Sequence, residues 1–240
     1  MNNQNIREDN VIPTIKGIAK SAISSIPIVG STAVEVWNEV ESKQVERKIQ
    51  RLEEFFNGLS NELDKLKDQI NEECLKNEDI LDIFEQTSRQ VISERNKDKR
   101  LMFKNIFEHT ITDSKSDFDE TEQFLRILHE LSQFQLEILA ILYGPSRYNK
   151  KHGYIIPDPI NNQYQSSWGQ YSAREIMSRL FPNKKDEIRP AIAYLYYNGL
   201  VEEKLMDRTF QTNDNPIHIL DNSLTTFGKK FVLYLLDPQV

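Results

Sequence analysis

The sequence predicts a mainly α-helical protein, with an N-terminal helical bundle that contains a long heptad-patterned helix and a C-terminal winged-helix domain with a small β-hairpin wing. Three observations predict this fold class. A seven-residue hydrophobic repeat begins at Val45, and such a repeat is typical of a long bundle helix. Further apolar stripes at helical spacing follow between residues 80 and 131. From Ser132 onward, helix patterns, a hairpin pattern and a last helix stand in the order of a winged helix.

Composition and charge indicate a soluble protein with specific partners. The chain has 240 residues, of which 38% are hydrophobic and 28% charged, so it can form one large or two modest domains. The net charge of -7 argues against a general nucleic-acid coat. The single Cys74 cannot form an internal disulfide and no signal-peptide pattern opens the chain, so we expect a cytoplasmic protein. The expected organisation is a disordered N-terminus at 1–10, a helical bundle domain at 11–131 and a winged-helix domain at 132–240 with an insertion at 144–169.

An apolar segment, Ile12–Trp37, precedes the heptad helix, and Pro27 and Gly30 interrupt its helical spacing. The uncharged run inside it has 14 residues, which is shorter than the ~20 residues that a helix needs to span a bilayer. Two interpretations remain. The segment forms a kinked helical pair that closes the bundle, or it is an amphipathic element that enters a membrane, as in pore-forming effectors. The candidate membrane residues are Ile15, Ile23, Ile26, Val29 and Val34.

The heptad stripe alternates steps of four and three residues, which places all its members on one side of a helix. They are Val45, Ile49, Leu52, Phe56, Leu59, Leu63, Leu66 and Ile70. Because similar stripes follow in the same chain, we expect a seam of an antiparallel bundle rather than an intermolecular coiled coil. Gly58 weakens this helix by ~1 kcal/mol relative to Ala without ending it.

The densest positive cluster of the chain lies at 94–104, between two of the later stripes. Its cations are Arg95, Lys97, Lys99, Arg100 and Lys104. A charge run of this kind is most often the solvated junction of two helices. The alternative is a contact with an acidic partner or with a nucleic-acid backbone.

The expected winged-helix domain begins with a helix at Ser132–Tyr143, whose inward residues are Leu136, Leu139 and Leu142. A second helix follows at Ser172–Phe181. The third has Asp186 as its cap and ends at Asn198-Gly199, because glycine readily adopts the left-handed conformation of a helix C-terminus.

The wing is expected after this third helix. Leu200, Val201, Leu205 and Met206 form one strand, Ile217, Ile219 and Leu220 form the returning strand, and Asp207–Asn215 is the polar tip. The run Leu224–Phe231 then resembles the strand-to-helix closure of many bacterial winged-helix domains, with its last aromatic residue beneath the fold.

The third helix of this domain would be the recognition helix. Its candidate contacts with a partner or a nucleic acid are Lys184, Lys185, Arg189, Tyr196 and Tyr197. A nucleic-acid reader needs a basic face, but here acidic residues stand among the cations and the tyrosines suit a protein contact equally well. We therefore expect a protein partner first and a nucleic acid second.

The insertion at 144–169 is too long for a plain connector. Its candidate contact residues are Arg147, Tyr148, Lys150, Lys151 and Trp168. The alternative is a loop that folds over its own domain.

Enzymatic motifs are not found in the sequence. Gly30-Ser31-Thr32 lacks the upstream glycine and the lysine of a phosphate-binding loop. No nucleophile elbow, His-Glu-x-x-His motif or cysteine pair is present. The four histidines show no ligand spacing, so we predict no catalytic residue, no metal site and no cofactor.

The runs IPIVGSTAVEVWNEV, RNKDKRLMFKNIF and FLRILHELSQFQLEILAIL, followed by the winged-helix pattern, resemble a loose group of uncharacterised bacterial proteins that join a helical domain to a C-terminal winged helix. The resemblance covers nearly the whole chain and brings no active-site residue with it. It implies the two-domain architecture, a bacterial origin and a place among accessory genes, including phage-defence loci.

The expected function is that of a non-enzymatic interaction or adaptor subunit of a bacterial complex. The first alternative is a membrane-acting, pore-forming effector that uses residues 12–37. The second is a DNA-binding transcriptional regulator. The sequence does not predict the oligomeric state.

Overall fold

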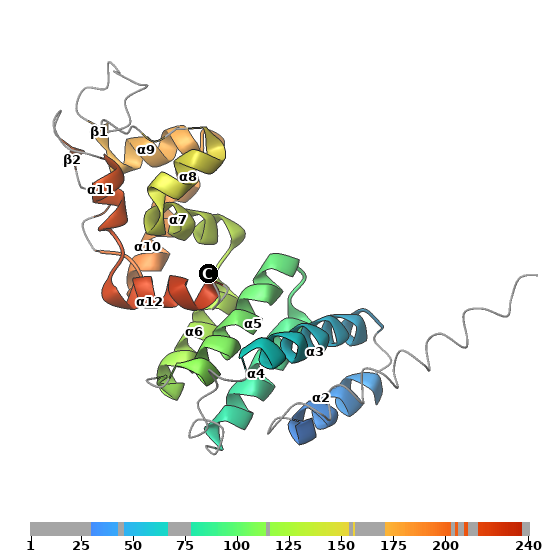
Figure 1. The fold of residues 1–240 in the computed structure, drawn as a ribbon. Helices are drawn as coiled ribbons and strands as arrows, with labels where there is room; N and C mark the ends of the chain where they lie inside the picture. Colours follow the sequence, from blue (N-terminus) through green and yellow to red (C-terminus); the bar gives the residue numbers. More distant parts are fainter. Residues whose placement is uncertain are drawn as a thin grey trace, which may run out of the picture. The chain divides into compact units, whose positions relative to one another are not determined.

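The computed structural model describes residues 30–42, 46–66, 78–113, 116–153, 156, 171–202, 205, 209–210 and 216–236. Over these residues the protein is mainly α-helical (Figure 1), as predicted. The chain divides into two compact units. The first runs to His129 and also takes in the chain from Tyr234 onward, and the second runs from Glu130 to Leu233.

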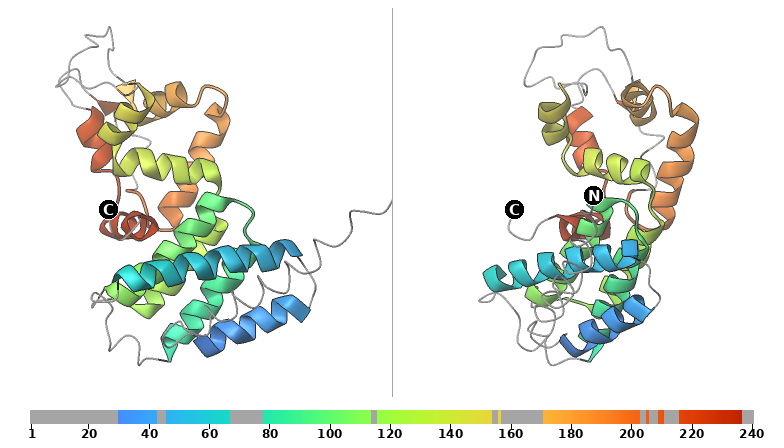
Figure 2. Two further views of the ribbon diagram at one scale, coloured as in Figure 1. Left: turned by 45° about the vertical axis from the view of Figure 1, so that its right-hand side comes forward. Right: turned by 90° about the vertical axis from the view of Figure 1, so that its right-hand side faces the viewer.

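The first unit is a helical bundle. Helix α3 lies across α4 and α5, and α2 packs against α3 and α4 (Figures 1 and 2). The helices that the structure describes in or at the boundary of this unit are α2 (Gly30–Ser42), α3 (Glu46–Leu66), α4 (Asp79–Ser93), α5 (Lys97–Thr112) and α6 (Phe118–Glu130).

The heptad stripe of α3 is buried against its neighbours in the same chain. Its four central members, Leu52, Phe56, Leu59 and Leu63, are all buried, and α3 contacts α2, α4 and α5. The stripe is thus a seam of the bundle within one chain. Val45, Ile70 and the side chain of Leu66 lie outside the described residues.

Four phenylalanine rings form the aromatic centre of this seam. The Phe84 ring stacks on the rings of Phe55 and Phe56, with centroid separations of 6.2 and 5.8 Å, and meets the edge of Phe107 at 5.4 Å. Such pairs add stabilisation beyond the apolar area that they bury. They join α3, α4 and α5 at one point.

Helix α2 supplies the described part of the apolar N-terminal segment. It begins at Gly30, where the sequence pattern resumes after its interruption. Ala33, Val36 and Trp37 are buried and Val34 is half-buried. This part of the segment therefore packs into the bundle. The other candidate membrane residues, Ile15, Ile23, Ile26 and Val29, lie outside the described residues.

Tyr234 and Leu235, near the end of the described chain, are held by helix α5 and the residue after it. The Asn105 side chain donates to the carbonyl of Leu235 at 2.8 Å. The Tyr234 hydroxyl donates to Asp113 at 2.9 Å, and its ring stacks on His109 at 4.9 Å. Burial and this hydrogen bond raise the pKa of Tyr234 above its ordinary range. No sequence pattern indicated that these residues belong to the first unit.

In the second unit, α7 contacts α8, α10 and α11. Two short strands pair antiparallel, Tyr171 with Phe210 and Ser172 with Thr209. The elements are α7 (Gln133–Tyr143), α8 (Pro145–His152), β1 (Tyr171–Ser172), α9 (Ala173–Leu180), α10 (Lys185–Tyr197), β2 (Thr209–Phe210), α11 (Pro216–Asp221) and α12 (Thr226–Leu235), whose last turn belongs to the first unit.

Helix α7 begins at a reciprocal cap. The Gln135 backbone N–H donates to the Ser132 hydroxyl at 3.3 Å, and the Ser132 N–H donates to the Gln135 side chain at 2.7 Å, so two of the N–H groups at this helix end find acceptors. Leu136, Leu139 and Leu142 are buried, as predicted.

Helix α10 does not begin as expected but ends as expected. The predicted cap, Asp186, lies inside the helix, which starts at Lys185 without a side-chain cap. At its other end Gly199 has φ of 71°. The Gly199 N–H donates to the carbonyl of Tyr196 at 2.8 Å and the Leu200 N–H to that of Leu195 at 2.9 Å. This pair of bonds closes the helix because it satisfies two carbonyls that the helix leaves without partners.

The predicted wing is wrong in its returning strand. Ile217, Ile219 and Leu220 belong to helix α11, whose first residue is Pro216, and proline favours that position of a helix. Val201 instead forms an isolated antiparallel bridge with Leu224. Short apolar runs do not distinguish strand from helix by periodicity. Met206 and the expected tip, apart from Thr209 and Phe210 of β2, lie outside the described residues.

The start of α12 is in close contact with the residues that end α10. The Thr225 hydroxyl donates to the Gly199 carbonyl at 2.5 Å and accepts from the Gly228 N–H at 2.8 Å. A Cβ at Gly228 would lie 2.0 Å from the Leu200 carbonyl oxygen, so only glycine fits this approach. Phe231, one turn further on, is fully buried, as the sequence predicts.

We expect Leu59→Ala to lower the free energy of unfolding by about 2–5 kcal/mol, because Leu59 is 0% exposed in the seam. Leu101→Ala is the matched control, since Leu101 is 52% exposed, and its effect should stay within about 0.5 kcal/mol. Urea denaturation measures both. If Leu59→Ala left stability unchanged and abolished self-association, the stripe would be an oligomer interface instead.

Two glycine substitutions should act in opposite directions. Gly228→Ala should destabilise the protein by at least about 2 kcal/mol, because the new methyl group overlaps the Leu200 carbonyl. Gly58→Ala should stabilise it by about 1 kcal/mol, because the nearest atom to the new Cβ is a Lys104 side-chain carbon at 3.5 Å and alanine favours the helix. Thermal unfolding of the two variants tests this, and a stabilising Gly228→Ala would show that the close approach is not present in solution.

Candidate functional site

The exposed face of α10 holds all five residues that the sequence selects for a partner contact. Lys185 and Arg189 lie within the helix, Lys184 immediately precedes it, and Tyr196 and Tyr197 are its last residues. All five side chains are exposed. The buried side of the helix is formed by Ile188, Ala191, Ile192 and Leu195. The face is thus displayed by a helix whose opposite side is fixed in the core.

The two tyrosines at the end of α10 are the largest exposed aromatic residues of the described chain. Tyr197 is 83% exposed and Tyr196 39%. Their ring centroids are 5.6 Å apart with planes tilted by 51°. The preceding tyrosine, Tyr194, is used differently, because its hydroxyl donates to Glu130. The tyrosine pair offers apolar area together with two hydroxyl groups.

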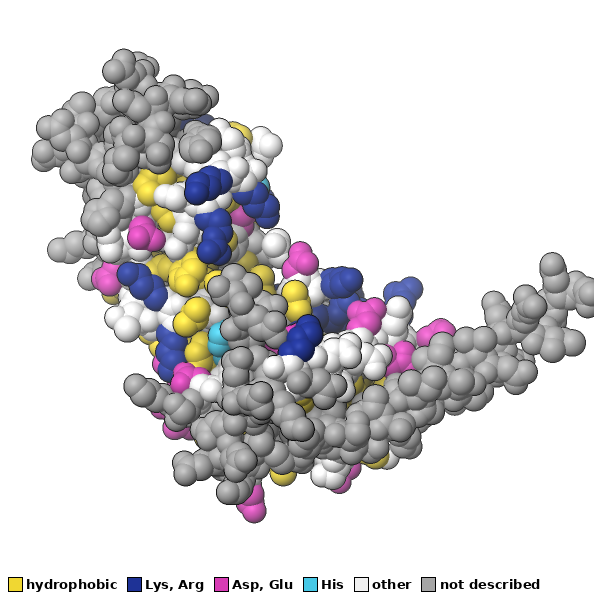
Figure 3. Space-filling model, viewed as in Figure 1, with side chains coloured by type: hydrophobic (Ala, Val, Ile, Leu, Met, Phe, Trp, Pro, Cys, Tyr) yellow, Lys and Arg dark blue, Asp and Glu magenta, His cyan; other side chains and the backbone are white. Residues whose placement is uncertain are grey.

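Charges on this face are mixed. Lys184 extends its ammonium group to 4.5 Å from the centroid of the Phe134 ring and to 3.9 Å from Glu187. Asp186 and Glu187 occupy the first turn of α10, where carboxylates interact favourably with the helix dipole. The acidic residues among the cations therefore have a local structural role. Figure 3 shows one face of the protein, on which Lys and Arg side chains are interspersed with acidic, apolar and other side chains.

The positive cluster at 94–104 is divided between the interior and the surface. Lys99 is buried, and its ammonium donates to the carbonyl of His129 at 2.9 Å and lies 3.5 Å from Glu94. Lys104 is also buried and pairs with Glu108 at 2.6 Å. Only Arg95 and Lys97 of the predicted cations are exposed.

Arg100, the fifth cation of this cluster, holds the junction of α4 and α5 together. Its guanidinium donates to the Arg95 carbonyl at 3.0 Å and to Glu54 of α3 at 3.0 Å. Lys99 and Arg100, predicted as nucleic-acid or partner contacts, therefore belong to a network within the bundle rather than to a solvated helix junction.

Glu94 completes this junction. Its carboxylate accepts the Asn96 N–H at 2.7 Å and faces Lys99. Burial opposes ionisation of Glu94, but the Asn96 N–H and the Lys99 charge outweigh it and hold the pKa of Glu94 below its ordinary value.

Four of the five loop candidates lie on a helix. Arg147, Tyr148, Lys150 and Lys151 belong to α8, because Pro145 favours the first turn and Gly153, with φ of 90°, ends it. The structure thus corrects the expectation of a loop for this part of the insertion. Trp168 lies outside the described residues.

Some side chains of α8 are exposed and others pack within the unit. Arg147, Lys150 and Lys151 are exposed, whereas Tyr148 stacks on His152 at 4.3 Å. Burial and the charge of Glu137 raise the pKa of Tyr148. Asn149 is buried and exchanges two hydrogen bonds with the backbone of Ile156, at 2.7 and 2.8 Å, which fixes the chain where it leaves the helix.

A groove between α3 and α5, which we call the α3–α5 groove, was not anticipated. Its volume is about 180 Å³, and it is lined by Arg51, Glu54, Phe55, Gly58, Val91, Lys97, Asp98, Arg100, Leu101 and Lys104. Its lining residues come from segments up to about fifty positions apart in the chain. Gly58, for which the sequence predicts only a local weakening of the helix, is the one glycine of α3.

Among the described residues, no group of three or more His, Cys, Asp or Glu side chains could hold a metal ion. None of the described helices is long and apolar enough to cross a membrane. Comparison with protein-family models gives no match, and neither do comparisons with curated proteins and with solved structures.

The Glu94 carboxylate should make stability depend on acid. Because its folded pKa lies below the ordinary value of 4.5, its contribution is fully present above that value and is lost as the pH falls through the folded pKa. We therefore expect Glu94→Gln to destabilise the protein near neutral pH and to converge on the wild type as the pH falls below 4.5. Chemical denaturation of both proteins across this range measures the difference, and a pH-independent gap would contradict the role of the charge.

Proposed function

We propose that the protein is a non-enzymatic interaction subunit, and that its second unit is a winged-helix module whose α10 face binds a protein partner. The observation that carries the proposal is the tyrosine pair, with Tyr197 83% exposed at the end of a helix whose other side is buried. Exposed aromatic residues are enriched at the centres of protein interfaces, where they account for much of the binding energy.

The order of the elements supports the winged-helix assignment. Helix α7 is followed, after α8, by strand β1 and helices α9 and α10. Beyond α10, Val201 forms an antiparallel bridge with Leu224. The segment between these two residues takes the place of the wing, although α11 lies within it. In this arrangement α10 is the recognition helix, the element that such domains present to a partner.

The distribution of charge favours a protein over a nucleic acid. A nucleic-acid reader neutralises phosphates with a basic face. Here Lys184 already lies against Phe134 and near Glu187, and Asp186 stands beside Lys185. Elsewhere Lys99, Arg100 and Lys104 are bound inside the first unit. The exposed cations of α10 therefore stand among carboxylates and do not form the continuous basic face of a nucleic-acid reader.

The burial of α2 favours the adaptor over the membrane-acting alternative. Trp37, Val36 and Ala33 are all within the bundle, so inserting this helix into a membrane would first expose these side chains. With the resemblance to bacterial proteins of this architecture, we propose a subunit of a larger complex in the bacterial cytoplasm. Phage-defence assemblies are one kind of such complex.

A photo-crosslinking amino acid at position 197 tests the proposal in the native host. We expect a discrete protein adduct at this position and none at the control position Lys229, which is exposed on α12. With the partner identified, Tyr197→Ala should weaken binding by about 2 kcal/mol or more and change the stability of the protein by less than about 0.5 kcal/mol.

Two results would contradict the proposal. An adduct that nuclease digestion removes would identify a nucleic acid as the partner. Equal adducts at 197 and 229 would show that the tyrosine pair is not a specific contact.

A further inference from the structure

The α3–α5 groove has a buried apolar floor and an exposed apolar edge. Phe55 of α3 and Val91 of α4 are buried at its base, while Leu101 of α5 is 52% exposed at its edge. An exposed leucine next to a recessed aromatic ring gives an apolar visitor contacts on two sides. With a volume of about 180 Å³, the groove is smaller than the pockets that enclose drug-sized ligands. It suits a single large apolar side chain.

Gly58 keeps this groove open at a cost to its own helix. It lies within α3, where glycine is less favourable than alanine. The nearest atom to a Cβ built at Gly58 is a Lys104 side-chain carbon at 3.5 Å, which is an ordinary contact. The packing of the described residues therefore does not require glycine at this position. The absence of a side chain at Gly58 leaves space in the groove.

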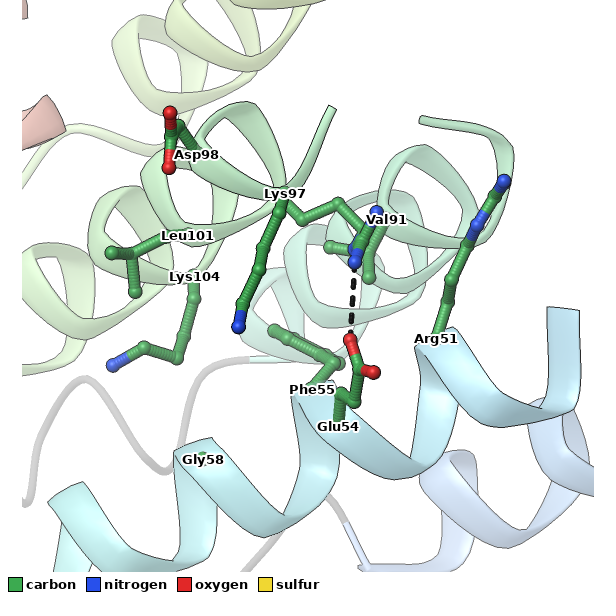
Figure 4. A pocket seen from close by; sticks show the side chains of 10 residues that line it. Arg51, Glu54, Phe55, Gly58, Val91, Lys97, Asp98, Leu101 and Lys104 are labelled. Atoms are coloured by element: carbon green, nitrogen blue, oxygen red, sulfur yellow. Dashed lines mark hydrogen bonds and ion pairs between the residues drawn. The ribbon is translucent and has the colours of Figure 1, made fainter. Parts of the chain in front are cut away.

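The polar groups around the groove are predominantly positive. Four cationic and two anionic side chains line it. Arg100 and Glu54 are paired with each other at 3.0 Å, and buried Lys104 is paired with Glu108 at 2.6 Å. Asp98 points away from α3 (Figure 4), so Arg51 and Lys97 supply the positive charge at the groove. Lys97 and Lys104 extend toward α3 beside Phe55 and Gly58 (Figure 4). The groove is therefore positively charged, although the whole chain has a net charge of -7.

We propose that the α3–α5 groove binds an acidic segment of a partner protein, which places one large apolar side chain against Phe55 and its carboxylates beside Lys97 and Arg51. The apolar floor supplies the anchor site and the cationic rim selects the acidic flanks. Arg51 is already oriented, because one of its nitrogens donates to the carbonyl of Ile92 at 2.8 Å while its remaining donors stay available at the rim.

This site lies in the first unit and does not depend on the α10 face. Failure of the tyrosine-pair experiment leaves the groove untouched, and the reverse also holds. A protein with both sites would carry one contact on each unit.

The test uses the full-length protein and a display library of short random peptides as the probe. The library is first depleted on the double variant Gly58→Met/Lys97→Glu, whose groove is filled and whose rim charge is reversed, and is then selected on the wild type. We expect enrichment of peptides that carry one leucine or aromatic residue between acidic residues. Enrichment of basic or uncharged peptides, or of none that distinguish the two proteins, would overturn the proposal.

Single variants test separately the space at Gly58 and the positive charge of Lys97. Gly58→Met and Lys97→Glu should each weaken binding of a selected peptide by about tenfold or more. Gly58→Ala should have the smaller effect, and Lys150→Glu, which changes the net charge equally on exposed α8, should have none. Circular dichroism confirms that each variant is folded. An unchanged affinity in both groove variants would overturn the site.

The same proteins are titrated with a labelled DNA hairpin. DNA binding that Lys97→Glu abolishes and that the selected peptide displaces would show that the groove binds phosphates, and would overturn the assignment to an acidic protein segment.

Discussion

The first unit depends on cations that bind the carbonyl groups at the ends of helices. The last carbonyls of an α-helix have no partners within the helix and carry partial negative charge. Lys99 of α5 donates to the carbonyl of His129 near the end of α6, and Arg51 of α3 donates to that of Ile92 near the end of α4. Arg100 binds the Arg95 carbonyl in the link that follows α4. A buried ammonium group without such acceptors would cost several kcal/mol, so these contacts fix which helix ends can meet.

These contacts also determine which cations remain on the surface. The chain concentrates its positive charge at 94–104, and the fold turns the larger part of that charge inward. What remains outside is a mixed surface with two features that stand apart from it, the tyrosine pair of α10 and the α3–α5 groove. One offers exposed aromatic area and the other a recessed apolar floor with a cationic rim. Both are chemistries of protein recognition, and on these two features we base the proposal of an adaptor.

The sequence predicts the elements whose determinants are local. The stripe through Leu52 and Leu59 follows from its period, and the end of α10 follows from the left-handed conformation of Gly199. The sequence wrongly predicts a strand at Ile217–Leu220 because its three apolar residues fit a strand and a buried helix equally, and Pro216 decides in favour of the helix.

The roles of individual cations could not be predicted in the same way. Lys97 and Lys99 stand two positions apart and therefore on different faces of α5, but only the positions of α6 and its carbonyls determine which of them is buried. The α3–α5 groove likewise depends on residues far apart in the chain. A sequence pattern shows that a charge is present and does not show which acceptor it will meet.

We infer that Lys99 and Arg100 stabilise the first unit by donating to carbonyl groups near the end of α6 and in the link after α4. The most direct measurement is the free energy of unfolding of Lys99→Met compared with Lys97→Met, two substitutions that remove the same charge from the same helix. We expect a loss of about 1.5–3 kcal/mol for Lys99→Met, because the His129 carbonyl and Glu94 lose a charged donor. For exposed Lys97→Met we expect a change within about 0.5 kcal/mol. Equal effects of the two substitutions would contradict this inference.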